Sequence, residues 1–425
     1  MIKLSSVLSI KSVSQVLQHR LMSQNVKERP LSGIKVLDLT RIIAGPYCTQ
    51  ILGDLGADVY KIERLGAGDE CRQWGPPFIN GTDTSVYFAS VNRNKKSICV
   101  DFHTENGRKV IYDLAEKCDV LVENFLPGKL DKYKIGYDDL KKVAPHLIYC
   151  SITGYGNKGP YSNRPGYDQI AAARGGFLHI TGPKDGEPVK CGVAITDVCT
   201  GLYAHGAIMA ALLQRNKTKR GQKIDCNLLS TQLSVLINIG GNYLNAGIEA
   251  ERLGTSHASL VPYEAFPTKD GYLTICCGSN SQFADFCKRL NVPELINDKR
   301  FDTNPHRVEN RDSLTPILRK IFKEKTKEEL CEIFEGASFP YGPLNTLAEA
   351  FDDKHVKEIG IVKTLTHEKL GSIKVVGSPV VYSENENIEY TPIPLLGEHT
   401  TEVLTNVLNY DNKKIEELKN LKVIQ

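Results

Sequence analysis

Several features that define whole classes of protein are scarce or absent in this sequence. The net charge is only +3, because 53 Lys and Arg residues face 50 Asp and Glu residues. Such a balance, without a basic run longer than a few residues, excludes a protein that coats nucleic acid. The apolar run 202–213 is too short to cross a membrane and includes His205, so it predicts a buried helix. We therefore expect neither nucleic acid nor a membrane as a partner.

Two motif classes are also missing. The twelve cysteines form no CxxC pair and no Cys/His cluster, which argues against structural zinc and a disulfide framework and favours a reducing compartment. No GxGxxG follows the first predicted strand, where "VLDLT" (36–40) continues as "RIIAGP". A nicotinamide-dependent oxidoreductase is therefore disfavoured.

The N-terminal segment differs in composition from the rest of the chain. Residues 1–27 carry Lys3, Lys11, Arg20 and Lys27, several serines and no acidic residue. Apolar residues at positions 10, 13, 17 and 21 fall on one helical face. This pattern is typical of a mitochondrial transit peptide, and the alternative is a tail without regular structure. We expect a presequence over 1–29 and a location in the mitochondrial matrix.

From residue 30 onward, short apolar runs alternate with segments of helical spacing. The predicted strands are 34–39, 58–63, 97–102, 119–125 and 147–152, and the predicted helices are 45–57, 105–117 and 138–143. This alternation predicts an α/β fold with a mostly parallel sheet, whose ligands bind beyond the carboxyl ends of the strands.

The pattern changes after a further predicted strand at 223–227 and a helix at about 228–245. A hairpin with an Asp270-Gly271 turn is expected within 262–280, followed by charged helical segments to about 335. We predict a large domain over 30–224, a smaller α+β domain over 225–340, and a return to the large domain over 341–425.

One carboxylate stands at a predicted strand-to-helix junction. In "CGVAITDVCTG" (191–201), Asp197 precedes the apolar run described above. Position alone favours a helix N-cap, whose oxygen accepts backbone N–H bonds. The alternative is a nucleophile or base held at a helix N-terminus.

Six ordered blocks carry a resemblance to a known family. They are "VLDLTRIIAGPYCTQILGDLGADVYKIER" (36–64), "NRNKKSICVDF" (92–102), "DVLVENFLPGKLDKYKIGYDDL" (119–140), "GYGNKGPYSNRPGYD" (154–168), "GVAITDVCTGLYAHGAIMAAL" (192–212) and "PLLGEHT" (394–400). The chain resembles the family III CoA-transferases, which include formyl-CoA transferase, carnitine CoA-transferase and acyl-CoA racemases. The resemblance implies a large Rossmann-like domain built from both chain ends, a smaller inserted domain, and an interlocked homodimer.

The resemblance also implies a role for Asp197. In transferases of this family, the matching aspartate attacks the donor thioester, forms an aspartyl–acyl anhydride, and then carries CoA as an aspartyl thioester. A carboxylate suits this chemistry because it is ionised at pH 7 and needs no general base. The implied donor is succinyl-CoA, and the implied acceptor is a dicarboxylic acid such as glutarate or 3-hydroxy-3-methylglutarate. CoA thioesters are substrates, and no permanently bound cofactor is expected.

Further residues match CoA contacts of formyl-CoA transferase. They are Arg41, Ile42, Arg64, Val100 to His103 (including Val100 and His103), Asn124 to Leu126 (including Asn124 and Phe125), and Lys132. Formyl-CoA transferase has His at the position of Arg41 and Arg at that of Lys132, so these two contacts depart from its pattern. Lys132 keeps the charge without the bidentate fork.

Three residues are candidates for substrate binding. Arg93 is suited to hold a distal carboxylate, or it contacts CoA phosphate or is structural. Gly278 matches a glycine-containing loop of the small domain, or is a plain turn. Tyr167 stands where the racemases have a histidine, and tyrosine is a poor base at pH 7.

Alternatives to this function remain open at this point. They are a 2-methylacyl-CoA racemase or epimerase, a CoA-transferase for another carboxylic acid, and a CoA-binding protein without catalysis. Glu398 and His399 are expected to cap the last helix.

Overall fold

The structure, a computed structural model, describes residues 28–79, 81–384 and 389–425. The predicted presequence, apart from its last two residues, lies outside this part of the chain. The described chain forms two compact units. The first comprises the residues up to Ala171, Ala194–Gln232 and Ile361–Gln425, and the second comprises Ala172–Val193 and Leu233–Gly360. The second unit thus begins and ends later than the insertion predicted at 225–340, and it also takes in a segment before Asp197.

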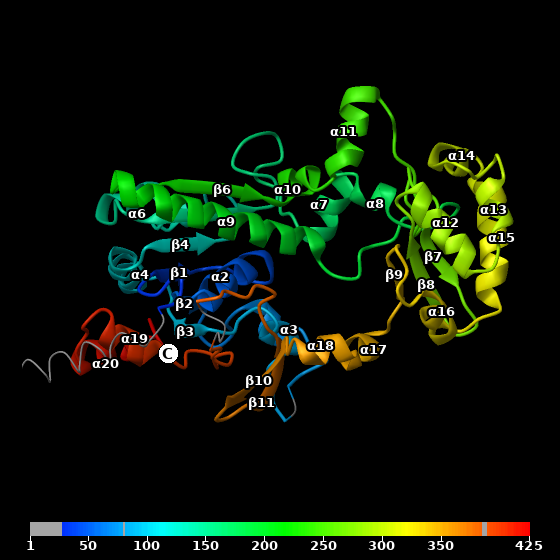
Figure 1. Cartoon of the computed structure of the whole chain (residues 1–425). Coiled ribbons are helices and arrows are strands. Elements are labelled where there is room, and N and C mark those ends of the chain that lie inside the picture. Colours follow the sequence, from blue (N-terminus) through cyan, green and yellow to red (C-terminus); the bar gives the residue numbers. More distant parts are fainter. Residues whose placement is uncertain (1–27, 80, 385–388) are drawn as a thin grey trace, which may run out of the picture. The chain divides into compact units, whose positions relative to one another are not determined.

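A six-stranded sheet organises the first unit (Figure 1). Its strands are β1 (Lys35–Asp38), β2 (Asp58–Glu63), β3 (Lys95–Cys99), β4 (Val120–Glu123), β5 (Ile148–Thr153) and β6 (Lys223–Asn227). They are parallel in the order β3-β2-β1-β4-β5-β6. This is the strand order of doubly wound dinucleotide-binding folds. The predicted Rossmann-like architecture is therefore confirmed.

Helices cover both faces of this sheet. Those of the first unit are α2 (Ala44–Asp54), η1 (Glu70–Gln73), α3 (Val86–Ala89), α4 (Glu105–Lys117), α5 (Lys129–Lys132), α6 (Tyr137–Val143), α9 (Ile195–Thr218), α19 (Thr400–Asn406) and α20 (Asn412–Asn420). A hairpin of β10 (Val362–His367) and β11 (Gly371–Val376) completes the unit, and α7 (Asp168–Arg174) and α10 (Leu228–Ser234) lie at its boundaries.

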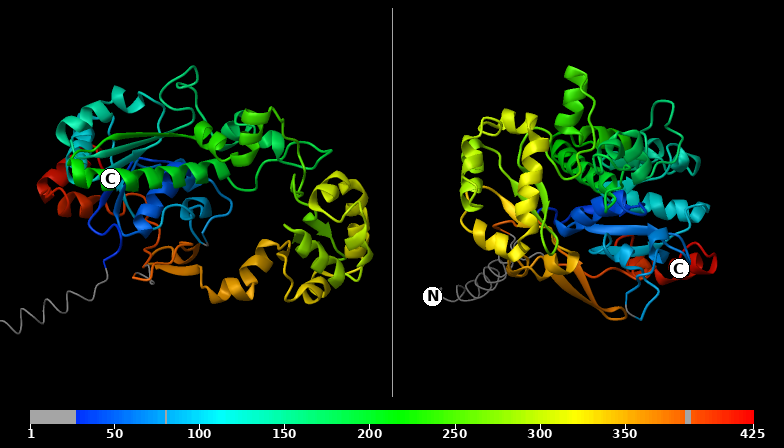
Figure 2. Two further views of the ribbon diagram at one scale, coloured as in Figure 1. Left: turned by 45° about the horizontal axis from the view of Figure 1, so that its top comes forward. Right: turned by 90° about the vertical axis from the view of Figure 1, so that its right-hand side faces the viewer.

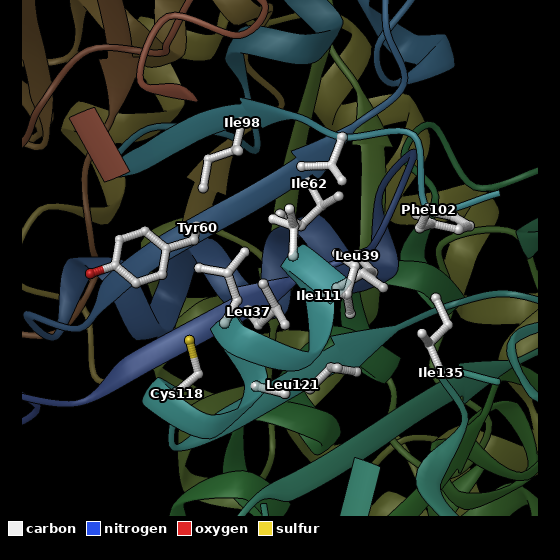
Figure 3. Packing of buried hydrophobic residues seen from close by; sticks show 14 of the residues in the cluster. Leu37, Leu39, Tyr60, Ile62, Ile98, Phe102, Ile111, Cys118, Leu121 and Ile135 are labelled. Carbon is white, nitrogen blue, oxygen red and sulfur yellow. The ribbon is translucent and has the colours of Figure 1, made fainter. Parts of the chain in front are cut away.

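Alternating side chains of the strands build two separate cores. Val36, Val120 and Ile148 point to the face covered by α2 and α9. Leu37 and Leu121 point to the opposite face, where α4, α6, α19 and α20 pack (Figure 3). Because strand side chains alternate, the near-continuous apolar runs of the sequence are what a sheet buried on both faces requires.

Helix α9 is the longest element of the first unit. Its 24 residues are apolar enough, by length and composition alone, to cross a membrane. The helix packs on α2, β5 and β6, and contributes Ala204, Ile208, Ala211 and Leu212 to the core. These contacts account for its apolar composition as that of a core helix. It is longer than the run 202–213 from which it was predicted.

The second unit has its own core around a small antiparallel sheet. Its strands are β7 (Tyr263–Pro267), β8 (Tyr272–Cys276) and β9 (Tyr341–Pro343). Its helices are α8 (Phe177–Ile180), α11 (Ile237–Ala246), α12 (Asn280–Arg289), α13 (Glu294–Asn297), α14 (Asn304–Glu309), α15 (Arg311–Lys323), α16 (Lys327–Phe334), α17 (Leu347–Asp352) and α18 (Lys354–Glu358). Figure 2 shows the yellow helices of this unit packed around its short strands. Phe266, Phe286, Phe322 and Phe334 fill the space between them.

Candidate active site

A cleft of about 270 Å³ opens beyond the carboxyl ends of β1, β4 and β5. The chain order of the sheet reverses between β1 and β4, and ligands of such folds bind at this reversal. The cleft is lined by 41–44 after β1, 124–126 after β4, 152–154 at the end of β5, 165–167, Asp197 and Leu228. The sheet thus brings together residues from four of the six sequence blocks.

Asp197 enters this cleft from the first turn of α9. It is the third helical residue, whereas the N-cap is Ala194, which has no side chain able to cap. Within the described part of the chain, no hydrogen bond to the Asp197 carboxylate is recorded, and the side chain is 9% exposed. The N-cap interpretation of Asp197 is therefore wrong, and its carboxylate is not used for capping.

A second aspartate performs the capping instead. Asp168, the first residue of α7, accepts the backbone N–H bonds of Thr196 at 2.8 Å and of Asp197 at 3.1 Å through one carboxylate oxygen. These are two of the N–H groups that the start of a helix leaves without partners. Asp168 was not identified from the sequence, because its role depends on a contact across 28 residues.

Burial and charge both act on Asp197. Burial raises its pKa, the neighbouring Asp168 raises it further, and the result is about 7. Both effects disfavour the ionised form of a carboxyl group. A carboxyl group whose pKa is raised by burial and a like charge, and which lies in a cleft, is a candidate for a functional site.

Two tyrosines flank this carboxylate pair. Tyr167, directly before Asp168, lines the cleft and is 58% exposed. Tyr87 of α3 is half-buried, and its pKa rises to about 12, first through burial and then through Asp197 and Asp168. Its hydroxyl therefore stays protonated and can donate a hydrogen bond. Tyr87 was missed in the sequence, where it stands 110 positions before Asp197.

The loops after β1 and β4 are joined by reciprocal hydrogen bonds. Arg41 N–H donates to Asn124 Oδ1 at 2.9 Å, and Asn124 Nδ2 donates to the Arg41 carbonyl at 2.7 Å. The Arg41 guanidinium lies 4.7 Å from the centre of the Phe125 ring. Together with Ile42, these sequence-predicted residues form one wall of the cleft.

A second cavity of about 240 Å³ adjoins the cleft and shares Arg41 and Phe125 with it. It also contains Arg64, which follows β2, and His103, which follows β3, as the sequence predicted for CoA contacts. Lys129 of α5 lines this cavity as well, although the sequence pointed to Lys132. In addition to Arg41, the cavity therefore offers the basic side chains of Arg64, His103 and Lys129, beside the carboxyl groups of Glu63 and Asp69.

Val100 and Lys132, both predicted as CoA contacts, line neither cavity. Val100 is buried and bridges the chain end at Ile424. Lys132 is exposed at the end of α5, one turn beyond Lys129. The two lysines are three positions apart on this short helix, and Lys129 is the one that lines the cavity.

The sequence model of CoA-transferase family III matches residues 31–400 of the chain. The chain belongs to this family. A succinyl-CoA:glutarate CoA-transferase of Mus musculus is 53% identical over 92% of the chain and 89% of its own length. A succinate–glutarate CoA-transferase of Agrobacterium fabrum is 39% identical over 90% of the chain and 96% of its own length.

Solved structures agree with this family. A CaiB/BaiF family protein from Brucella suis has a TM-score of 0.81 and 40% sequence identity, over 89% of this chain and 100% of its own. The family III CoA-transferase described here therefore has the fold that its sequence blocks imply.

Arg93 of this CoA-transferase is engaged in the protein interior. Its guanidinium donates to both carboxylate oxygens of Asp54, at 2.9 and 2.5 Å, and to the Val376 carbonyl at 2.9 Å. Arg93 is buried, and it lines neither the cleft nor the adjoining cavity. These contacts favour the structural alternative over the substrate contact.

The last two residues singled out in the sequence have local roles. Gly278 lies in the second unit, where its N–H donates to Gln282 Oε1 at 2.8 Å before α12. His399 occupies the N-cap position of α19 without a side-chain capping bond. Glu398 instead accepts the Leu395 N–H at 2.7 Å and contacts His367 at 3.2 Å.

Proposed function

We propose that this enzyme moves CoA from succinyl-CoA to glutarate or a similar dicarboxylic acid, with Asp197 as the nucleophile. The observation that carries the proposal is the Asp197 carboxylate, which is buried, free of hydrogen-bond partners in the described chain, and placed in a cleft. The substrates named for the Mus musculus and Agrobacterium fabrum relatives support the choice of acids.

The first half of the reaction loads CoA onto the enzyme. An Asp197 oxygen attacks the thioester carbonyl of succinyl-CoA, the C–S bond breaks, and CoA departs as its thiolate. The succinyl group and Asp197 are now joined in a mixed anhydride. The thiolate then attacks the aspartyl carbonyl, the C–O bond breaks, and succinate departs. The product is an Asp197–CoA thioester, and no proton or water is consumed.

The second half repeats these steps with the acceptor. A glutarate carboxylate attacks the aspartyl thioester, CoA thiolate leaves, and a second anhydride forms. The thiolate attacks its glutaryl carbonyl, which yields glutaryl-CoA and restores the Asp197 carboxylate. Each attack creates an oxyanion, and we assign its stabilisation to the N–H groups of Ile43 and Ala44, which open α2 beside the cleft.

In this proposal, the two cavities bind different parts of the acyl-CoA substrate. The adjoining cavity takes phosphate groups of CoA, because Arg64, His103 and Lys129 line it. The cleft takes the acyl group, where Tyr167 is the proposed hydrogen-bond donor to a carboxylate. Arg41 stands where the cavities meet.

The lining of the cleft argues against a racemase. Racemisation needs two groups that exchange a proton with the α-carbon. Among the described residues that line the cleft, Asp197 is the carboxylate, and there is no histidine; position 167 holds a tyrosine.

The homodimer remains part of the proposal. Support comes from α11, where Ile237 and Leu244 are 75% and 82% exposed although both are large apolar residues. A pairing of subunits would remove this surface from water. Sedimentation equilibrium at micromolar concentration distinguishes a mass of twice 47.1 kDa from a monomer.

The mitochondrial matrix is the proposed location, on the composition of residues 1–27. A fluorescent protein fused after residue 29 tests this directly. Import requires the basic residues, so replacing the four of them by glutamine should leave the fusion in the cytosol.

Product analysis by mass spectrometry tests the reaction. Protein lacking residues 1–27 is incubated with succinyl-CoA and a panel of carboxylic acids, beside Asp197→Ala and Asp197→Asn. Glutaryl-CoA and succinate in equal amounts, made only with Asp197 present, support the proposal. A new thioester from a different acid corrects the acceptor, and no thioester from any acid sinks the transferase.

A further inference from the structure

Ile42 has a backbone conformation that its side chain disfavours. Its φ angle is +74°, in the left-handed region that β-branched residues rarely adopt. The residue lies in the loop between β1 and α2 and lines the cleft. A strained conformation of this kind persists only where surrounding contacts impose it, and such residues gather at functional sites.

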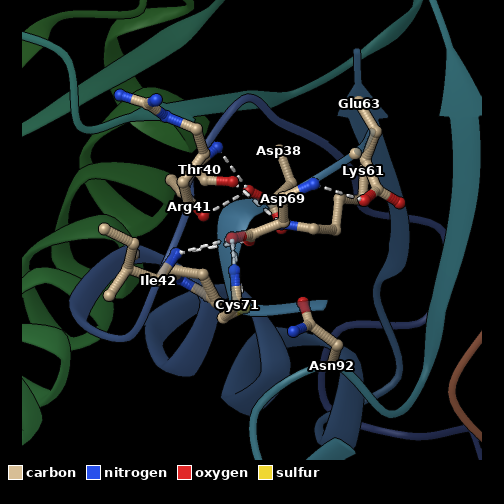
Figure 4. Close-up of polar contacts among 12 residues, drawn as sticks. Asp38, Thr40, Arg41, Ile42, Lys61, Glu63, Asp69, Cys71 and Asn92 are labelled. Carbon is tan, nitrogen blue, oxygen red and sulfur yellow. Dashed lines mark hydrogen bonds and ion pairs between the residues drawn. The ribbon is translucent and has the colours of Figure 1, made fainter. Parts of the chain in front are cut away.

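One buried carboxylate imposes this conformation. Asp69 accepts the Ile42 N–H at 3.1 and 3.2 Å through its two oxygens (Figure 4). Asp69 also accepts the Cys71 N–H at 3.2 Å, as the N-cap of η1. It is 2% exposed, so water cannot replace these bonds.

A buried lysine supports the carboxylate. Lys61 of β2 is fully buried, and its ammonium group donates to Asp69 Oδ2 at 2.9 Å and to the Thr40 carbonyl at 2.8 Å. Burial alone would raise the pKa of Asp69, but Lys61 and the Cys71 hydrogen bonds hold it at about 2. Lys61 thus contacts the same loop twice, once directly and once through Asp69.

The adjacent residue holds the side chain before Ile42. Glu70 accepts from the Arg41 guanidinium at 2.7 Å, while Arg41 Nε is buried without a partner among the described residues. Two consecutive acidic residues therefore hold two consecutive loop residues. Asp69 binds the backbone N–H of Ile42, and Glu70 binds the guanidinium group of Arg41.

The geometry assigns to Asp69, with Lys61 as its buried counter-ion, the role of a positioning residue that fixes the Arg41–Ile42 loop for the CoA thioester. This inference rests on the proposed function for the identity of the ligand. If the loop needed only this backbone conformation, glycine at position 42 would adopt it without strain. The chain has isoleucine there, so the contacts around it must hold the strained conformation. The buried Lys61–Asp69 ion pair holds this conformation of the Arg41–Ile42 loop, which lies where the two cavities meet.

Two substitutions at position 42 test the conformation while leaving the ion pair intact. Ile42→Gly keeps the N–H and permits positive φ, whereas Ile42→Pro removes the N–H and fixes φ near −65°. Free CoA binding is measured by calorimetry, and kcat and KM with succinyl-CoA and glutarate. We expect Gly to bind CoA within about fivefold of the natural enzyme, and Pro to lose roughly tenfold or more. Equal CoA affinity for both folded variants overturns the inference.

Two double variants test the carboxylate itself. Lys61→Met with Asp69→Asn removes both charges but keeps an oxygen for the Ile42 N–H; Lys61→Met with Asp69→Leu removes the oxygen as well. Replacing both members of a buried ion pair avoids leaving one charge unpaired. The Asn form should keep CoA affinity within about threefold and the Leu form should lose roughly tenfold, in KM more than in kcat.

Rescue separates positioning from general damage. Ile42→Gly added to the Leu form should restore part of the CoA affinity, because glycine reaches positive φ without the clamp. No rescue, with all forms folded by circular dichroism, contradicts the inference. If the natural enzyme makes no glutaryl-CoA while CoA affinity follows the expected order, the proposed acceptor fails and the positioning role stands.

Discussion

Replacing Asp168 by asparagine should make Asp197 ionise at lower pH. Asn keeps an oxygen for the N–H groups of Thr196 and Asp197, so the change removes the charge and retains the cap. That charge is the second cause, after burial, of the pKa of about 7 at Asp197.

The size of the effect follows from Coulomb's law. Two unit charges about 6 Å apart, the outer range at which a neighbouring charge shifts a pKa markedly, repel by about 0.7 kcal/mol at a dielectric constant of about 80 and by about 2.8 kcal/mol at about 20. Since about 1.36 kcal/mol corresponds to one pKa unit, the pKa of Asp197 should fall by roughly 0.5 to 2. A fall of about 1 raises the ionised fraction at pH 6 about fivefold.

The assay is the pH dependence of kcat/KM for succinyl-CoA between about pH 5 and 9, which reports ionisations of the free enzyme. The acidic limb of the profile should move to lower pH in Asp168→Asn. Glu116→Gln, which removes one negative charge from an exposed position of α4, is the matched control and should leave it in place. An acidic limb that stays unchanged or moves upward in Asp168→Asn refutes the reasoning.

Three further predictions concern other residues of the first unit. Asp197→Asn should stabilise the fold by up to about 4 kcal/mol at pH 8 but not below about pH 4. The reason is that the pKa of Asp197 is about 7 in the folded state and about 3.9 in the unfolded state, so folding disfavours the ionised form. Urea unfolding at both pH values checks the sign. Arg64→Ala and Lys129→Ala should each raise KM for succinyl-CoA roughly tenfold, while Lys132→Ala stays within about twofold in the same kinetics. Arg93→Ala should cost about 3–5 kcal/mol of stability by leaving Asp54 buried and unpaired, and an unchanged melting temperature with a raised KM for glutarate would restore its substrate role.

Local patterns were sufficient to predict the sheet. The strands observed at Asp58–Glu63 and Lys223–Asn227 coincide with those predicted, because a short apolar or β-rich run bounded by turn residues allows few alternatives. The helix predicted at 228–245 is divided into α10 and α11, and Ile237, the first residue of α11, has a positive φ angle. Helical spacing continues across such a break and does not reveal it.

The site was predictable where a single block carries the chemistry and less so where distant residues meet. Asp197 was predicted from its own block, whereas Asp168 acts on it across 29 positions, and Tyr87, whose pKa Asp197 raises, stands 110 positions away. Arg93 was a fair candidate by residue type, but its ion pair with Asp54 depends on a contact over 39 positions. Charges in a sequence do not show which of them are already neutralised by the fold.

The C-terminal residues have a consequence for how the chain is made. All six strands of the large sheet have been synthesised by Asn227, yet one of its faces is closed by Val403, Leu418 and Ile424 from the last two helices and the chain end. Asp101 N–H donates to the Val423 carbonyl at 2.8 Å, and Gly66 N–H donates to the Gln425 side chain at 2.8 Å. One face of the sheet therefore stays uncovered until residues 403–425 have packed on it, and its apolar side chains are accessible to other chains during that interval.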